Sequence, residues 1–157
     1  MPIAEQIAAF FLVFSLAGHG DAAQKSPRFV QKFKMPHSRA TVVVAEGEFE
    51  PRSVGSYVLN VYGGSSRRSP TDEFIAGIVR RRNGTVENVM FEDVTRDGIP
   101  DIVVIIRSAG SGGYLSTDAF RYQNRSLEFL GTVSGLDKGA DPVEALRDRL
   151  KTSNREK

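Results

Sequence analysis

Residues 101–107 read Asp-Ile-Val-Val-Ile-Ile-Arg, an unbroken apolar run between an acidic and a basic residue. A strand with one face in water alternates apolar and polar residues, whereas a strand covered on both sides is apolar throughout. The run therefore predicts a central strand that is buried on both faces. The other strands of the domain have to be arranged around it.

Shorter runs with strand character precede this segment. Residues 41–45 are mostly β-branched, and residues 56–62 alternate with the period of a strand. Residues 24–38 have no regular period, so this stretch is expected to be irregular. Later in the chain, residues 114–122 and 127–133 flank a polar turn and are predicted to form a β-hairpin.

A further hairpin is predicted where residues 74–82 and 85–91 flank Asn83-Gly84, because this dipeptide is typical of two-residue hairpin turns. The same region holds the densest basic run, the three arginines at 80–82. We expect these arginines at the solvated end of the hairpin. With a net charge of only +2 and no basic stripe, nucleic acid is not an expected partner.

The C-terminus changes to a helical pattern. Asp141 can cap a helix that has Pro142 at its first position and Glu144 in its first turn. One face of this helix carries apolar residues, namely Val143, Leu146 and Leu150. Short strands followed by one helix predict an all-β fold, an antiparallel β-sandwich or flattened barrel with a C-terminal α-helix.

The first residues resemble an export signal. Residues 7–17 form an apolar block that is too short to span a bilayer, and small residues follow it up to Ala23. The segment before the block carries Glu5 and no basic residue, which departs from a standard signal. We predict a signal peptide at 1–23 and a single domain at 24–157. The chain has no cysteine, so disulfides and a cysteine-linked lipid anchor are excluded.

The stretch after the central strand, Arg-Ser-Ala-Gly-Ser-Gly-Gly-Tyr at 107–114, is unsuited to packing. Its glycines permit a positive φ and a close approach of backbone to a partner, although a plain turn needs the same residues. Ser111 supplies a small hydroxyl, and Tyr114 supplies a ring with a phenol. A loop of this composition on a rigid scaffold is a candidate binding site.

The sequence offers two chemical alternatives. Asp93, Asp97 and Asp101 imitate a calcium loop but lack the closing glutamate, and a tight turn with Asp–backbone hydrogen bonds explains them as well. A hydrolase that uses Ser111 as nucleophile would need a base, for which only His37 is available. Glu46, Glu48 and Glu50 alternate as on a solvated face. The sequence thus predicts no enzyme and no cofactor.

Three segments, at 46–57, 74–79 and 101–116, resemble the periplasmic inhibitors of invertebrate-type (i-type) lysozyme. The resemblance covers about residues 40–132, and its most specific part is a Ser-Gly-x-Tyr motif, here Ser111-Gly112-Gly113-Tyr114. It implies an exported, soluble periplasmic protein whose partner is an i-type lysozyme, with no nucleic acid and no membrane bound. It also allows a homodimer.

The resemblance implies that the motif loop enters the lysozyme cleft through Ser111 and Tyr114, while Gly112 and Gly113 shape its tip. Arg107 either pairs with an acidic group or anchors the base of the loop. Tyr57 either lies in a second contact loop or is an ordinary strand residue. The alternative function is a calcium-stabilised β binding module of the cell envelope, which would use the three aspartates.

Overall fold

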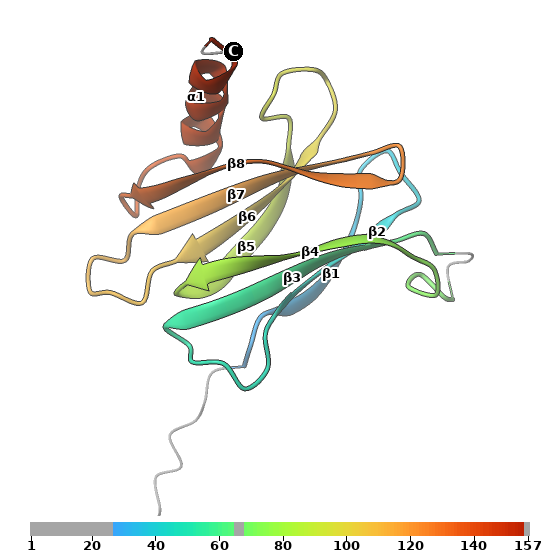
Figure 1. Cartoon of the computed structure of the whole chain (residues 1–157), viewed down its shortest axis with the longest axis horizontal. Coiled ribbons are helices and arrows are strands. Elements are labelled where there is room, and N and C mark those ends of the chain that lie inside the picture. Colours follow the sequence, from blue (N-terminus) through green and yellow to red (C-terminus); the bar gives the residue numbers. More distant parts are fainter. Residues whose placement is uncertain (1–26, 65–67, 156–157) are drawn as a thin grey trace, which may run out of the picture.

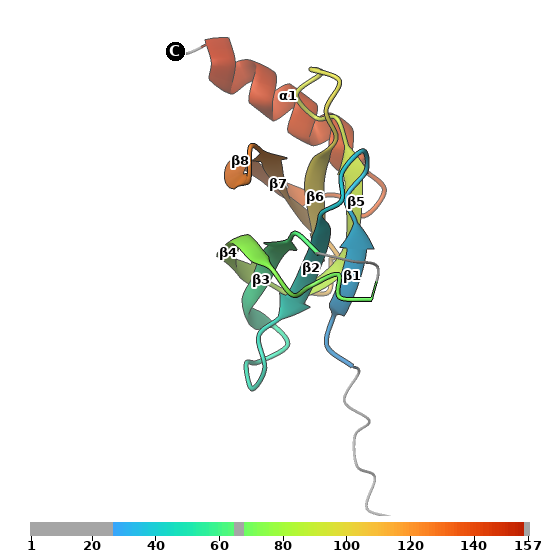
Figure 2. The same ribbon diagram turned by 90° about the vertical axis from the view of Figure 1, so that its right-hand side faces the viewer.

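The computed structural model describes residues 27–64 and 68–155, which form two antiparallel sheets and one helix (Figures 1 and 2). The strand orders are β1-β2-β3-β4 in the first sheet and β5-β6-β7-β8 in the second. The elements are β1 (Val30–Lys34), β2 (Thr41–Glu46), β3 (Val54–Tyr62), β4 (Phe74–Asn83), β5 (Thr85–Glu92), β6 (Asp101–Arg107), β7 (Leu115–Gln123), β8 (Ser126–Leu136) and α1 (Pro142–Arg155). The predicted all-β fold is confirmed in its sandwich form.

Strand β6 is buried on both faces, as predicted. Its alternate residues Ile102, Val104 and Ile106 belong to the core between the two sheets. Val103 and Ile105 face the opposite way, into a second apolar cluster under the helix. The reason for two-sided burial is therefore the helix, which covers the outer side of the second sheet (Figure 2).

Helix α1 begins as the sequence predicts. The carboxylate of Asp141 accepts hydrogen bonds from the backbone N–H groups of Val143 at 2.8 Å and Glu144 at 3.2 Å. These bonds satisfy two of the N–H groups that a helix N-terminus leaves unpaired. The apolar helix residues Val143, Leu146 and Leu150 pack against the strands. No helix in the described part of the chain is long and apolar enough to cross a membrane.

One predicted hairpin is confirmed and the other is wrong. Strands β7 and β8 pair antiparallel up to Gln123 and Ser126, with a two-residue turn between them. Strands β4 and β5 do not pair, because each lies at the edge of a different sheet. At Gly84 the chain passes from the first sheet to the second. The N–H of Gly84 donates to the carbonyl of Ser53 at 2.8 Å, and its φ of 117° suits only glycine.

The expectation of an irregular segment at 24–38 is also wrong in part. Strand β1 lies within it and pairs antiparallel with β2, from Val30 opposite Ala45 to Lys34 opposite Thr41. This is an edge strand, and most of its residues are exposed. Only Phe33 of this strand packs against the core, so its sequence needs no apolar alternation and shows no period.

Two charged residues that were expected at the surface are buried. Arg82 donates to the carbonyls of Ser56 and Arg52, and its side chain is fully enclosed. Glu46 accepts from Arg52 at 2.7 Å and from the backbone N–H of Val86 at 2.7 Å. Arg82 thus binds carbonyls in and just before the start of β3, and Glu46 binds an N–H at the start of β5. The expected exposure holds for Arg81 and Glu48.

Candidate binding loop

The connection between β6 and β7, residues 108–114, projects from one end of the sandwich, at the left in Figure 1. The N–H of Ser108 donates to the carbonyl of Tyr114 at 2.8 Å and closes the loop at its base. Within the loop, the N–H of Gly113 donates to the carbonyl of Gly110 at 3.2 Å and forms a tight turn. The loop therefore has a defined backbone shape, which we call the β6–β7 loop.

Two glycines are required by this shape. Gly113 has a φ of 60°, in the left-handed region that side chains other than Asn and Asp rarely adopt. Gly112 lies under the ring of Tyr114, and a Cβ atom there would overlap the ring. The predicted role of Gly112 and Gly113 in shaping the tip thus has a steric basis.

Arg107 holds the base of the loop. Its guanidinium donates to both carboxylate oxygens of Glu87 on β5, with 2.7 Å between Nη2 and Oε1. Nη1 also donates to the carbonyl of Gly113 at 3.0 Å. The hydrogen bond with Glu87 raises the pKa of Arg107 above its ordinary value. Arg107 thus both pairs with an acidic group, Glu87, and anchors the base of the loop.

The two side chains of the motif that can contact a partner both face solvent. Tyr114 is 49% exposed although its ring rests on Gly112. Ser111 lies exposed at the turn, and its hydroxyl has no hydrogen-bond partner among the described residues. The β6–β7 loop thus presents a free hydroxyl beside a half-exposed ring on a braced backbone.

Tyr57 does not join this surface. Its side chain is completely buried between the sheets, and its hydroxyl donates to the carboxylate of Asp118 at 2.5 Å. Burial, and then the negative charge of Asp118, raise the pKa of the phenol far above its ordinary value. Arg80 approaches the same carboxylate at 3.5 Å. Tyr57 is therefore a strand residue of the core, and its assignment to a second contact loop is wrong.

The aspartates at 93–101 form the tight turn that was one of the two interpretations. Asp93 accepts from the N–H groups of Arg96, Asp97 and Gly98 at 2.6–3.1 Å. Asp101 accepts from Arg121 at 3.1 Å, and Asp97 pairs with the same guanidinium at 2.9 Å. Asp97 and Asp101 thus already share a cationic partner, the guanidinium of Arg121. Across residues 27–64 and 68–155, no group of three or more acidic or histidine residues is placed to hold a metal.

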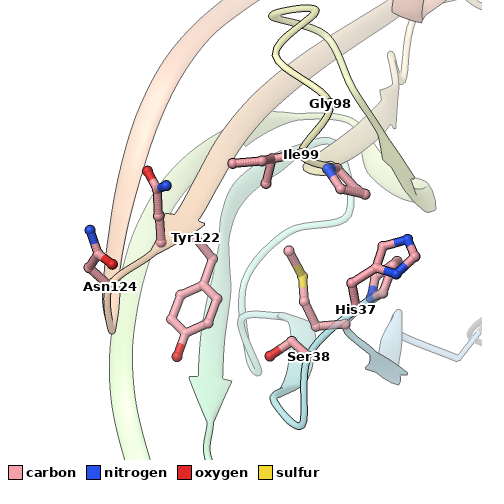
Figure 3. A pocket seen from close by; sticks show the side chains of 10 residues that line it. His37, Ser38, Gly98, Ile99, Tyr122 and Asn124 are labelled. Carbon is pink, nitrogen blue, oxygen red and sulfur yellow. The ribbon is translucent and has the colours of Figure 1, made fainter.

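His37 lies at the opposite end of the sandwich from Ser111. It lines a pocket of about 390 Å³ together with Tyr122, Asn124 and Pro100, the residue before β6 (Figure 3). Ser111 follows the other end of β6, and a strand of this length spans about 20 Å. The base that a Ser111 nucleophile needs is therefore out of reach, which removes the hydrolase alternative.

Residues 27–150 match the model of a protein family described as the periplasmic lysozyme inhibitor of I-type lysozyme, PliI. The chain belongs to the PliI family. PliI proteins are inhibitors and not enzymes, and the family is periplasmic by description. A search of curated proteins found no match.

Two solved PliI structures are similar to this fold. The first is PliI-Ah from Aeromonas hydrophila, with 38% identity and a TM-score of 0.71 over 75% of this chain and 98% of that chain. The second is A. hydrophila PliI in complex with Meretrix lusoria lysozyme, with 39% identity and a TM-score of 0.70. That match covers 76% of this chain and 95% of that chain.

The sequence did not reveal which residues brace the PliI motif. Glu87 lies in a correctly predicted strand, but its contact with Arg107 depends on the pairing of Thr85 with Arg107 across β5 and β6. The incorrect hairpin prediction paired β5 with β4, so the register between β5 and β6 could not be inferred. A correct assignment of the two sheets would have indicated Glu87 as the partner of Arg107.

Proposed function

We propose that this chain inhibits an I-type lysozyme by placing the β6–β7 loop in the substrate cleft of the enzyme. The observation that carries the proposal is the exposed pair Ser111 and Tyr114 on a loop braced by Arg107 and Glu87. Membership in the PliI family supports the class of partner. The role of the loop rests on its geometry and on the motif.

The chemistry of the loop suits a glycosidase cleft. Enzymes of this class cleave the glycosidic bond with a pair of carboxyl groups that flank it. A serine hydroxyl donates to a carboxylate and accepts from a protonated acid, so Ser111 can replace a sugar hydroxyl there. The ring of Tyr114 can fill a neighbouring sugar subsite while its phenol finds a polar partner.

The braced backbone favours tight binding. A loop that is ordered before association loses little conformational entropy when the complex forms. Inhibitors of this kind bind with little backbone movement, so the free conformation is the one that binds. The internal hydrogen bonds at Ser108, Gly113 and Arg107 serve this purpose.

The leader and the oligomeric state remain predictions. We propose that residues 1–23, which lie outside the described residues, are an export signal removed from a mature domain of residues 24–157. The periplasmic description of the family supports export. Mass spectrometry of the protein from the periplasm would give the mature N-terminus. Analytical ultracentrifugation would show whether a homodimer forms.

The test of the proposed function is a cell-wall lysis assay with an I-type lysozyme, with chicken-type and goose-type enzymes for comparison. We expect the purified protein to inhibit the I-type enzyme. Ser111→Ala and Tyr114→Ala should each weaken inhibition by about 1–4 kcal/mol, as central interface residues do. Thermal melting should stay unchanged. If the double variant keeps the inhibition constant of the natural protein, the assignment of the loop is wrong.

A further inference from the structure

The most exposed large apolar side chain of the described residues is Phe49, in the connection between β2 and β3. Its side chain is 97% exposed, which leaves a phenyl ring almost entirely in water. Its backbone has a φ of 62°, in the left-handed region. Both features are unfavourable for a bulky residue in an isolated protein, and backbone strain of this kind concentrates at sites of function.

The backbone around Phe49 is held firmly. The neighbouring Glu50 accepts hydrogen bonds from the backbone N–H of Ser56 at 2.6 Å and from its hydroxyl at 2.8 Å. Arg82 donates to the carbonyl of Pro51 at 3.1 Å and to that of Arg52 at 2.9 Å. Phe49 is thus displayed by a rigid loop, and its exposure does not result from a lack of structure around it.

This connection, residues 47–53, lies at the same end of the sandwich as the β6–β7 loop (Figure 1). Gly84 links the two. Its N–H donates to the carbonyl of Ser53, and its α-carbon lies so close to the carbonyl of Arg107 that a Cβ atom would overlap it. Arg107 anchors the β6–β7 loop, so Gly84 contacts the base of each of the two loops.

The size of the expected interface requires more than one loop. A specific protein–protein interface of standard size involves about 20–30 residues on each side. The motif Ser111–Tyr114 supplies four residues. The surface next to it therefore has to meet the lysozyme as well, and exposed aromatic residues are the side chains that most often anchor such contacts.

We propose that Phe49 is a second anchor of the lysozyme interface and inserts its ring into an apolar recess on the rim of the substrate cleft. This inference rests on the proposed function, since it places Phe49 at the same end of the sandwich as the loop that enters the cleft. The catalytic carboxyl pair is common to glycosidases of different folds, whereas the cleft rim differs between them. Phe49 accordingly contributes to selectivity between lysozymes, whereas the motif loop blocks the catalytic groups.

The experiment compares Phe49→Asn with the natural protein in the lysis assay and in surface-binding kinetics with an I-type lysozyme. Asparagine tolerates the left-handed backbone, so the loop keeps its shape while the ring is lost. Phe74→Asn is the matched control, because Phe74 is 60% exposed and begins β4, whose opposite end leads to Gly84. Phe49→Tyr keeps the ring.

We expect Phe49→Asn to weaken inhibition at least about tenfold, chiefly through faster dissociation, with an unchanged or higher melting temperature. Phe74→Asn and Phe49→Tyr should inhibit like the natural protein. Inhibition by Phe49→Asn within about twofold of the natural protein overturns the role of Phe49 and leaves the proposed function intact. If the natural protein itself does not inhibit, the proposed function fails together with this inference.

Discussion

The ring of Tyr114 covers the α-carbon of Gly112, and the structure leaves no room for a Cβ atom between them. This contact gives a steric reason for glycine at the second position of the Ser-Gly-x-Tyr motif, which Gly112 occupies. The tyrosine ring is oriented by lying on a glycine, while Arg107 fixes the backbone of Gly113 on the other side. The motif is thus a unit in which the glycine sets the direction of the ring.

Gly112→Ala should therefore weaken inhibition by displacing the ring of Tyr114, by on the order of tenfold. The matched control is Gly110→Ala in the same loop, where a Cβ atom would meet only the hydroxyl of Ser108 at 3.6 Å. Both variants should melt like the natural protein. Equal inhibition constants for the two alanine variants would show that the packing of Tyr114 on Gly112 is unimportant.

Arg107→Ala should weaken inhibition although we expect no contact between Arg107 and the lysozyme. Without the guanidinium the carbonyl of Gly113 loses its partner, and ordering the loop on binding then costs free energy. We expect a loss of roughly three- to tenfold. Glu87→Gln should give a smaller loss of the same kind. Hydrogen exchange of the loop amides in the free protein should speed up in both variants, and unchanged exchange would contradict the bracing role.

Tyr57→Phe should lower stability without affecting inhibition. The substitution removes the hydroxyl that donates to Asp118 and leaves this buried carboxylate with Arg80 alone. Loss of a buried hydrogen-bond partner costs about 1–3 kcal/mol, measurable by urea denaturation. Tyr62→Phe on the same strand is the control, because its hydroxyl has only a 3.5 Å contact with Asn60. Weakened inhibition by correctly folded Tyr57→Phe would mean that the core reaches the binding surface.

Glu50 should contribute to the pH dependence of stability. The backbone N–H of Ser56, and then its hydroxyl, hold the pKa of Glu50 below its ordinary value of 4.5. The unfolded chain therefore takes up this proton at higher pH than the folded one, so the contribution is present above pH 4.5 and is lost as the pH falls through the lowered pKa. Urea denaturation between about pH 6 and pH 3 should give a flatter dependence of stability on pH for Glu50→Gln than for the natural protein. Equal slopes for the two proteins would contradict this role of Glu50.

Predictions from local sequence were confirmed where neighbouring residues make the structure. The apolar run of β6, the cap of α1 at Asp141 and the β7–β8 turn all depend on residues close together in the chain. The Asn83-Gly84 turn was predicted on the same basis and is wrong. A positive φ at glycine permits a hairpin, but it also permits a crossover between sheets.

For the candidate site, the amino-acid sequence and its resemblance to the family indicated the loop, its glycines and the pair Ser111 and Tyr114. Only the tertiary structure decided that Arg107 braces the loop through Glu87, that Tyr57 is buried and that the connection holding Phe49 lies at the same end of the sandwich as the loop. The physical reason is the range of the interactions. Backbone conformation follows from adjacent residues, whereas burial and pairing depend on which distant strands become neighbours.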